Sequence, residues 1–112
     1  MVVPHAGYAY SGQVAAYAYR QVRDSAFDAV VLVGPSHRRP FRGVSVYASG
    51  GFETPLGVVP IDEGLARGIL ASGRDVSDTP DLHAQEHSLE IQLPFLQVAI
   101  GAFSLVPLMM GD

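Results

Sequence analysis

The sequence predicts a single α/β domain with a mostly parallel sheet and flanking helices. Phe27–Gly34 is an unbroken, largely β-branched run bounded by Gly and Pro, which is typical of a strand buried on both faces. An apolar run at Val2–Pro4 and a helical pattern over Gln13–Val22 precede it, so strand, helix and strand follow one another as in a βαβ unit. The 112 residues suffice for one small core, and a composition of 48% hydrophobic and 16% charged residues fits a packed domain.

The first unit is expected to run from a strand at the N-terminus through a helix to Phe27–Gly34. The first strand would end at His5, and the turn formers between His5 and Gly12 would lead into the helix Gln13–Val22. Ser11 is a candidate N-cap for this helix, because a serine hydroxyl can accept from a free backbone N–H of the first turn.

The middle of the chain predicts a strand, a hairpin and a helix. Gly43–Ser49 alternates enough for a third strand, and Phe52–Ile61 reads as a hairpin whose turn is Pro55-Leu56-Gly57. Asp62 is then expected to cap a short helix over Glu63–Ala71.

The last third predicts a loop, a helix and a buried strand. Ser72–Ala84 lacks periodicity and is expected to be a loop, whereas Glu86–Ile100 carries leucines at helical spacing. Pro94 either kinks this helix or restarts it, and Gly101 can end it. Ala102–Gly111 then predicts another buried strand.

Composition argues against several classes of partner. With 7 basic and 11 acidic residues the net charge is −4, which disfavours nucleic acid as a partner. Without cysteine the chain can build neither a disulfide framework nor a thiolate metal site. It shows no signal peptide and no apolar stretch of membrane-spanning length, so we expect a cytoplasmic protein without a membrane partner.

Two histidines give the strongest functional indication. His5 and His37 each follow an apolar run, and ligands of open α/β sheets bind beyond the carboxyl ends of the strands. If both runs are adjacent parallel strands, the two imidazoles would meet there and form half of a metal site. The alternative is that each histidine only forms a hydrogen bond inside a strand-end turn.

A second cluster lies at the start of the last predicted helix. The segment from His83 to Glu90 contains Glu86 and His87, residue types suited to ligation or proton transfer, and we take these two as candidate catalytic residues. His-x-x-Glu-His resembles a zinc-peptidase pattern, but the preceding loop composition argues against one continuous helix. The alternative is a helix N-terminus that favours the Glu86 carboxylate. Close to His5, Tyr8 and Tyr10 could orient a ligand, and Tyr10 is a third catalytic candidate.

Four motifs follow one another along the chain, at Val3–Gly12, Gly34–His37, Glu53–Gly57 and Glu86–Leu96. Together, and in this order, they resemble the Memo family, which includes the proteins called AmmeMemoRadiSam system protein B. The resemblance implies a fold like the catalytic subunit of class III extradiol dioxygenases, which use non-haem iron. It also implies that His5 and His37 match two of the family's metal-binding histidines and that His87 lines the same cavity.

The chain departs from the family pattern in one respect. Family members are longer and carry a Ser-Asp-x-Ser-His-like motif and a cysteine that completes a His-His-Cys metal set, and this chain contains neither. We therefore expect residues 1–112 to be a single Memo-like domain that is truncated at its C-terminus and lacks the third family ligand. A cysteine ligand shifts metal preference toward softer ions, so both iron and copper are candidate cofactors.

The resemblance leaves two functional hypotheses. The first is a metal-binding protein with redox or oxygenase chemistry on an unidentified small molecule, working beside a radical SAM protein as the family's composite name suggests. The second is a module without catalytic activity that captures a peptide or protein in the former active-site cleft. Metal content and oxygen consumption would discriminate between them.

Overall fold

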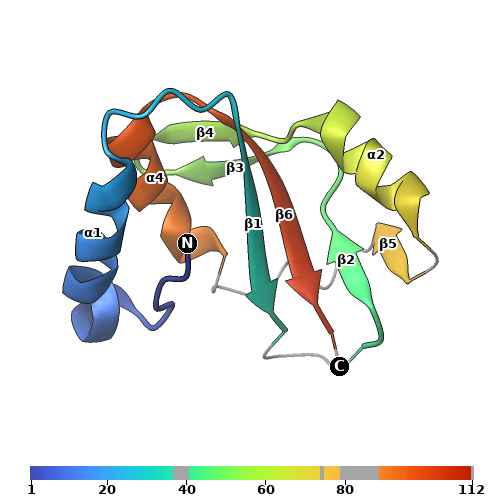
Figure 1. The fold of residues 1–112 in the computed structure, drawn as a ribbon, viewed down its shortest axis with the longest axis horizontal. Helices are drawn as coiled ribbons and strands as arrows, with labels where there is room; N and C mark the ends of the chain where they lie inside the picture. The colour runs from blue at the N-terminus through green and yellow to red at the C-terminus, as the bar shows by residue number, and fades with distance from the viewer. Residues whose placement is uncertain (37–40, 74, 79–88, 112) are drawn as a thin grey trace.

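The computed structural model describes residues 1–36, 41–73, 75–78 and 89–111, and within them the predicted α/β architecture is confirmed (Figure 1). The larger sheet has four strands, which lie in the spatial order β1 (Ala29–Pro35), β6 (Ser104–Met110), β2 (Val44–Val46) and β5 (Val76–Asp78). The helical segments are η1 (Tyr8–Gly12), α1 (Gln13–Tyr19), η2 (Arg20–Val22), α2 (Glu63–Ser72), η3 (Glu90–Gln92) and α4 (Leu93–Ile100). No helix in the described ranges is long and apolar enough to cross a membrane.

Strand β6 is the centre of the sheet. It pairs in parallel with β1, from Ala29 opposite Ser104 to Pro35 opposite Met110, and antiparallel with β2 on its other side. Strands β2 and β5 are again parallel, so the sheet is mostly parallel, as predicted. The side chains of β6 supply much of the core, which includes the almost fully buried Leu105, Val106 and Met109.

Strand β1 forms where the sequence predicts it, but the expectation that it is buried on both faces is wrong. Among the described strands it lies at the edge of the sheet and pairs with β6 alone. Val31 and Val33, which share one face of the strand, are 47% and 55% exposed. An apolar β-branched run predicts a strand correctly, yet it does not reveal whether both faces of that strand are covered.

The expected first strand is not formed, because residues 1–5 have no regular secondary structure and do not pair with β1. Pro4 cannot donate to a sheet ladder, and its carbonyl accepts from the Gln92 side chain instead. His5 and the end of β1 therefore do not stand on adjacent strands of one sheet. This corrects the geometric basis on which the two histidines were paired.

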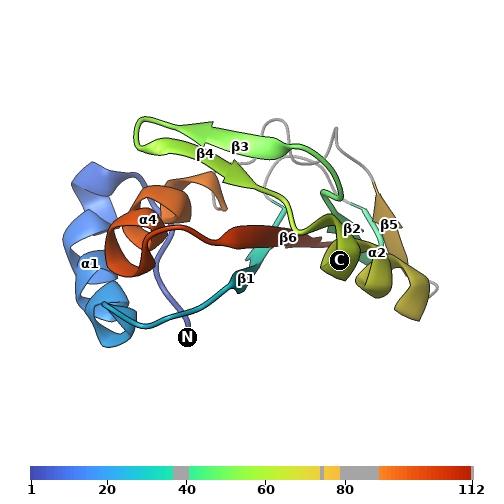
Figure 2. The same ribbon diagram turned by 90° about the horizontal axis from the view of Figure 1, so that it is seen from above.

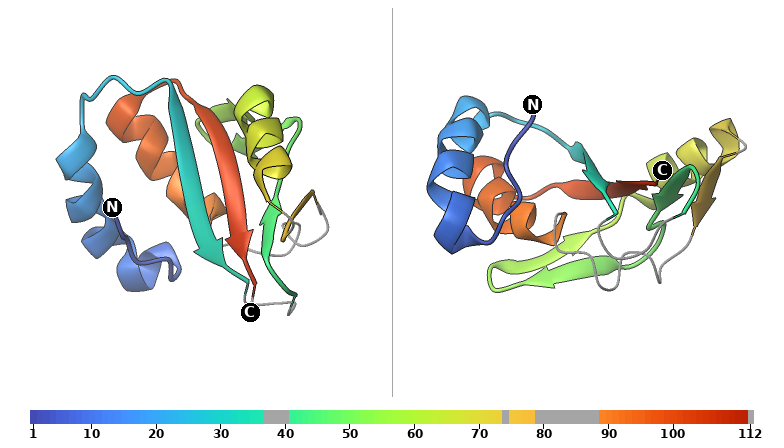
Figure 3. Two further views of the ribbon diagram at one scale, coloured as in Figure 1. Left: turned by 45° about the vertical axis from the view of Figure 1, so that its right-hand side comes forward. Right: turned by 90° about the horizontal axis from the view of Figure 1, so that it is seen from below.

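The predicted helix Gln13–Val22 is confirmed as α1 followed by the 3₁₀ turn η2. The prediction that Ser11 is its N-cap is wrong. A π-helical turn, η1, runs directly into α1, and the Ser11 hydroxyl donates to the Ala6 carbonyl at 3.0 Å. Helices α1 and α4 lie side by side beyond β1, on the opposite side of the molecule from α2 (Figure 3).

The hairpin and the helix after it agree with the sequence. Strands β3 (Gly51–Thr54) and β4 (Gly57–Pro60) are antiparallel and cross one face of the large sheet (Figure 2). Asp62 caps α2, since its Oδ1 accepts from the Leu65 N–H at 3.1 Å.

Toward the C-terminus, the predictions are confirmed in part. Within the expected loop after Ser72, residues Val76–Asp78 form the short strand β5. Pro94 stands in the first turn of α4, after the 3₁₀ turn η3, so it restarts the helix rather than kinking it. Gly101 ends α4 with φ +79°, a conformation that suits glycine.

Candidate functional site

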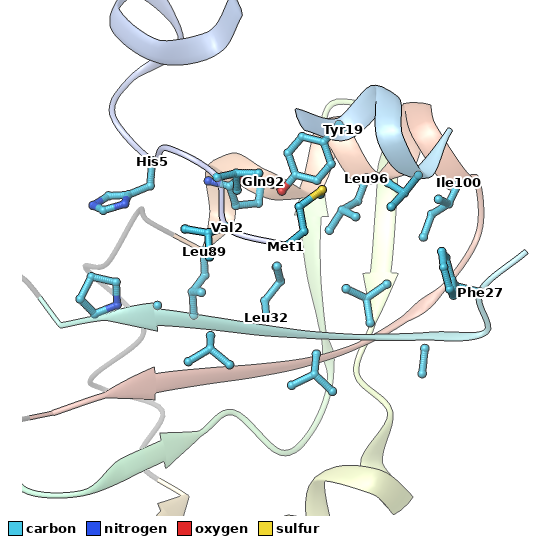
Figure 4. A pocket seen from close by; sticks show the side chains of 18 residues that line it. Met1, Val2, His5, Tyr19, Phe27, Leu32, Leu89, Gln92, Leu96 and Ile100 are labelled. Atoms are coloured by element: carbon cyan, nitrogen blue, oxygen red, sulfur yellow. Dashed lines mark hydrogen bonds between the residues drawn. The ribbon is translucent and has the colours of Figure 1, made fainter. Parts of the chain in front are cut away.

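The candidate site is a cavity of about 730 Å³ beside the open edge of β1 (Figure 4). Its floor is the whole of β1, and its other walls come from residues 1–3, from η3 and from the helical layer of α1 and α4. Most of the lining is apolar. The polar side chains among its described lining residues are those of His5, Tyr19 and Gln92.

His5 stands at the end of the cavity toward which β1 points, whereas Phe27 and Ile100 are at the opposite end (Figure 4). The imidazole is exposed to solvent. It is thus placed at the carboxyl end of a parallel strand, as the sequence predicts, although it comes from an irregular segment and not from a strand of its own.

Hydrogen bonds hold the backbone on both sides of His5. The Gln92 Nε2 donates to the Pro4 carbonyl at 3.2 Å, and the Ser11 hydroxyl donates to the Ala6 carbonyl at 3.0 Å. The next carbonyl, that of Gly7, accepts from the N–H groups of residues 10 and 11 at 2.9 and 3.1 Å. The segment that carries His5 is therefore ordered although it belongs to no sheet.

Two tyrosines connect this segment to the helical layer. The Tyr8 hydroxyl donates to the Ile91 carbonyl at 2.8 Å, and the Tyr19 hydroxyl donates to the Gln92 Oε1 at 2.6 Å. Both rings pack on Phe95, Tyr19 stacked at 5.2 Å between centroids and Tyr8 edge-on at 5.5 Å. The two tyrosines thereby fix the position of η3 against the N-terminal residues.

Both phenols stay protonated at neutral pH. Burial raises the pKa of Tyr8. Burial is also the main reason why the pKa of Tyr19 is raised to about 12, and the charge of Tyr8 adds a smaller contribution. Tyr19 is therefore a permanent donor to Gln92 under physiological conditions.

Sequence reasoning missed Tyr19 and Gln92. Tyr19 and Tyr17 are two residues apart, and side chains at that spacing do not share a helix face, so the sequence offers no tyrosine pair there. One signal was available for Gln92, because it is a polar residue within the mostly apolar segment from Leu89 to Leu96. In the structure its side chain is only 4% exposed, and a buried amide requires hydrogen-bond partners.

Tyr10, the third catalytic candidate, lies in η1 with 89% of its surface exposed. It is not among the described residues that line the cavity. Its part in catalysis stays a prediction.

The other predicted site residues, His37, Glu86 and His87, lie outside the described residues, as does His83. Their chain neighbours Pro35 and Leu89 both line the cavity that contains His5. Among the residues that the structure describes, no group of three or more His, Asp or Glu side chains could hold a metal ion. The described part thus contributes one imidazole to the predicted site.

Comparison with known proteins gives consistent matches. The profile of a family described as Memo-like protein matches residues 1–112. A MEMO1 family protein of Thermoplasma volcanium is 41% identical over 113 residues, covering 100% of this chain and 42% of the relative. MEMO1 family proteins of Thermotoga neapolitana and Thermotoga maritima are 43% and 42% identical, each covering 100% of this chain and 41% of the relative. The chain spans about two fifths of the length of these relatives.

Proposed function

This chain belongs to the Memo-like protein family, and we propose that it supplies the imidazoles of His5 and His37 to a redox-active metal ion. Iron and copper both accept neutral imidazole, so the donor chemistry suits either metal. The proposed activity is redox or oxygenase chemistry on a small molecule in the cavity beside β1. Glu86 and His87 would move protons at the substrate, because a carboxylate and an imidazole are the usual groups for that task.

One observation supports this proposal above all: the cavity is lined by His5 and by residues close in sequence to the other candidate histidines. Pro35 lines it two residues before His37 in the sequence, and Leu89 lines it two residues after His87. Because two residues of chain span at most about 7 Å, we propose that His37 and His87 also contribute to this site.

The walls of the cavity also suit such a centre. Apolar side chains of β1 and α4, among them Leu32 and Leu96, make up most of its lining. An apolar surrounding strengthens the electrostatic interaction between a metal ion and its ligands and influences the redox potential. The exposed imidazole of His5 leaves this centre accessible from one side.

Anaerobic titration with Cu(I) and Fe(II), in competition with a chelator, tests the proposal. We expect binding of one equivalent and a loss of affinity of about tenfold or more in His5→Ala and in His37→Ala. The matched control is His83→Ala, which removes an imidazole that the proposal does not use. Equal affinity in the wild type, His5→Ala and His37→Ala would refute the metal site.

A second candidate function is the capture of an extended apolar peptide. The open edge of β1 and the largely apolar cavity beside it favour this alternative, since an unpaired edge can accept another strand. A fluorescently labelled valine-rich peptide would then bind without added metal, equally well in the wild type and in His5→Ala. Absence of binding by the metal-free chain would reject it.

A further inference from the structure

We propose that Gln92 and Tyr19 are positioning residues for His5, and this inference rests on the metal site proposed above. The Gln92 side chain connects three parts of the molecule: its own turn η3, helix α1 through Tyr19, and the N-terminal segment through Pro4. The Pro4 carbonyl belongs to the peptide bond that enters His5. Holding this carbonyl restricts the direction in which the His5 side chain leaves the backbone.

The need for such a device follows from the irregular conformation of residues 1–5. A ligand at the end of a strand is held by the hydrogen bonds of the sheet, but His5 belongs to a segment outside the described strands. Side-chain hydrogen bonds from η3 take the place of those of the sheet. Gln92 holds residue 4 and the Ile91 carbonyl holds the Tyr8 hydroxyl, so one turn of chain fixes the segment on both sides of His5.

Tyr19 determines which way the Gln92 amide faces. Its hydroxyl donates to Oε1 at 2.6 Å, and this leaves Nε2 as the group that faces Pro4. The opposite orientation would place Oε1 against the Pro4 carbonyl, two acceptors without a proton between them. The Tyr19 ring is held in turn by its stack on Phe95, with 10° between the ring planes.

The arrangement also links two parts of the proposed site. Turn η3 begins at Glu90 and follows Leu89, which lines the same cavity as His5. His87 precedes Leu89 by two residues. A displacement of η3 would therefore alter both the position of His5 and the cavity wall at Leu89.

The test compares Gln92→Glu, Tyr19→Phe and the control Tyr17→Phe. Gln92→Glu keeps the shape of the side chain and the acceptor for Tyr19 but removes the donor to Pro4. Tyr19→Phe keeps the ring stack and removes only the hydroxyl, so it serves if Gln92→Glu fails to fold. Tyr17 lies on the same helix and is 58% exposed.

The first measurement is amide hydrogen exchange without metal. We expect the Tyr10 and Ser11 amides, which donate to the Gly7 carbonyl, to exchange about tenfold faster in Gln92→Glu and Tyr19→Phe. The amides of α4 should be unchanged, and Tyr17→Phe should match the wild type. Unchanged exchange at residues 10 and 11 in the folded variants would overturn the proposal.

The second measurement is Cu(I) affinity in the wild-type and His5→Ala backgrounds. We expect Gln92→Glu to weaken binding about tenfold when His5 is present and to have no effect when it is absent. Equal effects in both backgrounds would show a general structural role and overturn the positioning role. If the wild type binds neither Cu(I) nor Fe(II), the metal site itself is refuted, while hydrogen exchange still decides whether Gln92 and Tyr19 hold the His5 segment.

Discussion

Alkaline pH is expected to destabilise the fold through Tyr19. Burial raises the pKa of this phenol in the folded chain to about 12, from an ordinary value of 10.0. Because the folded pKa is raised, the stabilisation is fully present below pH 10 and is lost as the pH rises toward 12. A difference of two pKa units corresponds to about 2.7 kcal/mol, of which about 2 kcal/mol should be lost by pH 12.

The Tyr19→Phe variant separates this effect from other alkaline titrations. At pH 8 the variant should be about 1 kcal/mol less stable than the wild type, because the Gln92 Oε1 loses its buried donor. At pH 12 the order should reverse, since the variant has no phenol at this position to ionise. Urea unfolding followed by circular dichroism from pH 8 to 12 measures both differences.

Tyr17→Phe is the control, because it removes a phenol hydroxyl from the same helix at an exposed position. The raised pKa of Tyr8 acts in the wild type and in the variant alike. If the stability curves of the wild type and Tyr19→Phe run parallel between pH 8 and 12, Tyr19 is not the buried donor described above.

Three further predictions concern the fold. Asp62→Ala should lower the free energy of unfolding, measured in urea, by about 1 kcal/mol because α2 loses its cap. Asp62→Asn keeps an acceptor and should lower the free energy of unfolding by less. Gly43→Ala should cost more than about 1 kcal/mol in the same assay, since φ is +87° and a Cβ would collide with the Asp75 carbonyl oxygen. The exposed edge strand β1 is expected to favour self-association, and Val33→Lys should reduce it in sedimentation velocity because it places a charge on that strand; an unchanged distribution would exclude this strand as the contact.

The elements that sequence predicted well are those determined by local chemistry. The Asp62 cap, the hairpin turn around Pro55 and the glycine that ends α4 each depend on residues within one or two turns of chain. The apolar run of β6 is likewise a local signal, and the strand formed where it was expected.

What sequence did not predict depends on partners far away in the chain. Which faces of β1 are covered is decided by residues beyond the run itself, so its exposed valines could not be foreseen. Tyr19 and Gln92 are separated by 73 positions, and no spacing rule connects them. The position of His5 beside the end of β1 was expected from strand pairing, but side-chain hydrogen bonds from η3 produce it instead.

The central position of β6 affects how the chain can fold during synthesis. Ala29 of β1 pairs with Ser104 of β6, and 75 residues separate them. At ribosomal rates of about 5–20 residues per second, this interval lasts roughly 4–15 s. Strands β1 and β2 cannot join the large sheet before β6 emerges, so the apolar run Val30–Val33 stays available to chaperones throughout that interval. Variants that weaken β6 should therefore reduce the yield of folded protein in cells more than their equilibrium stability suggests.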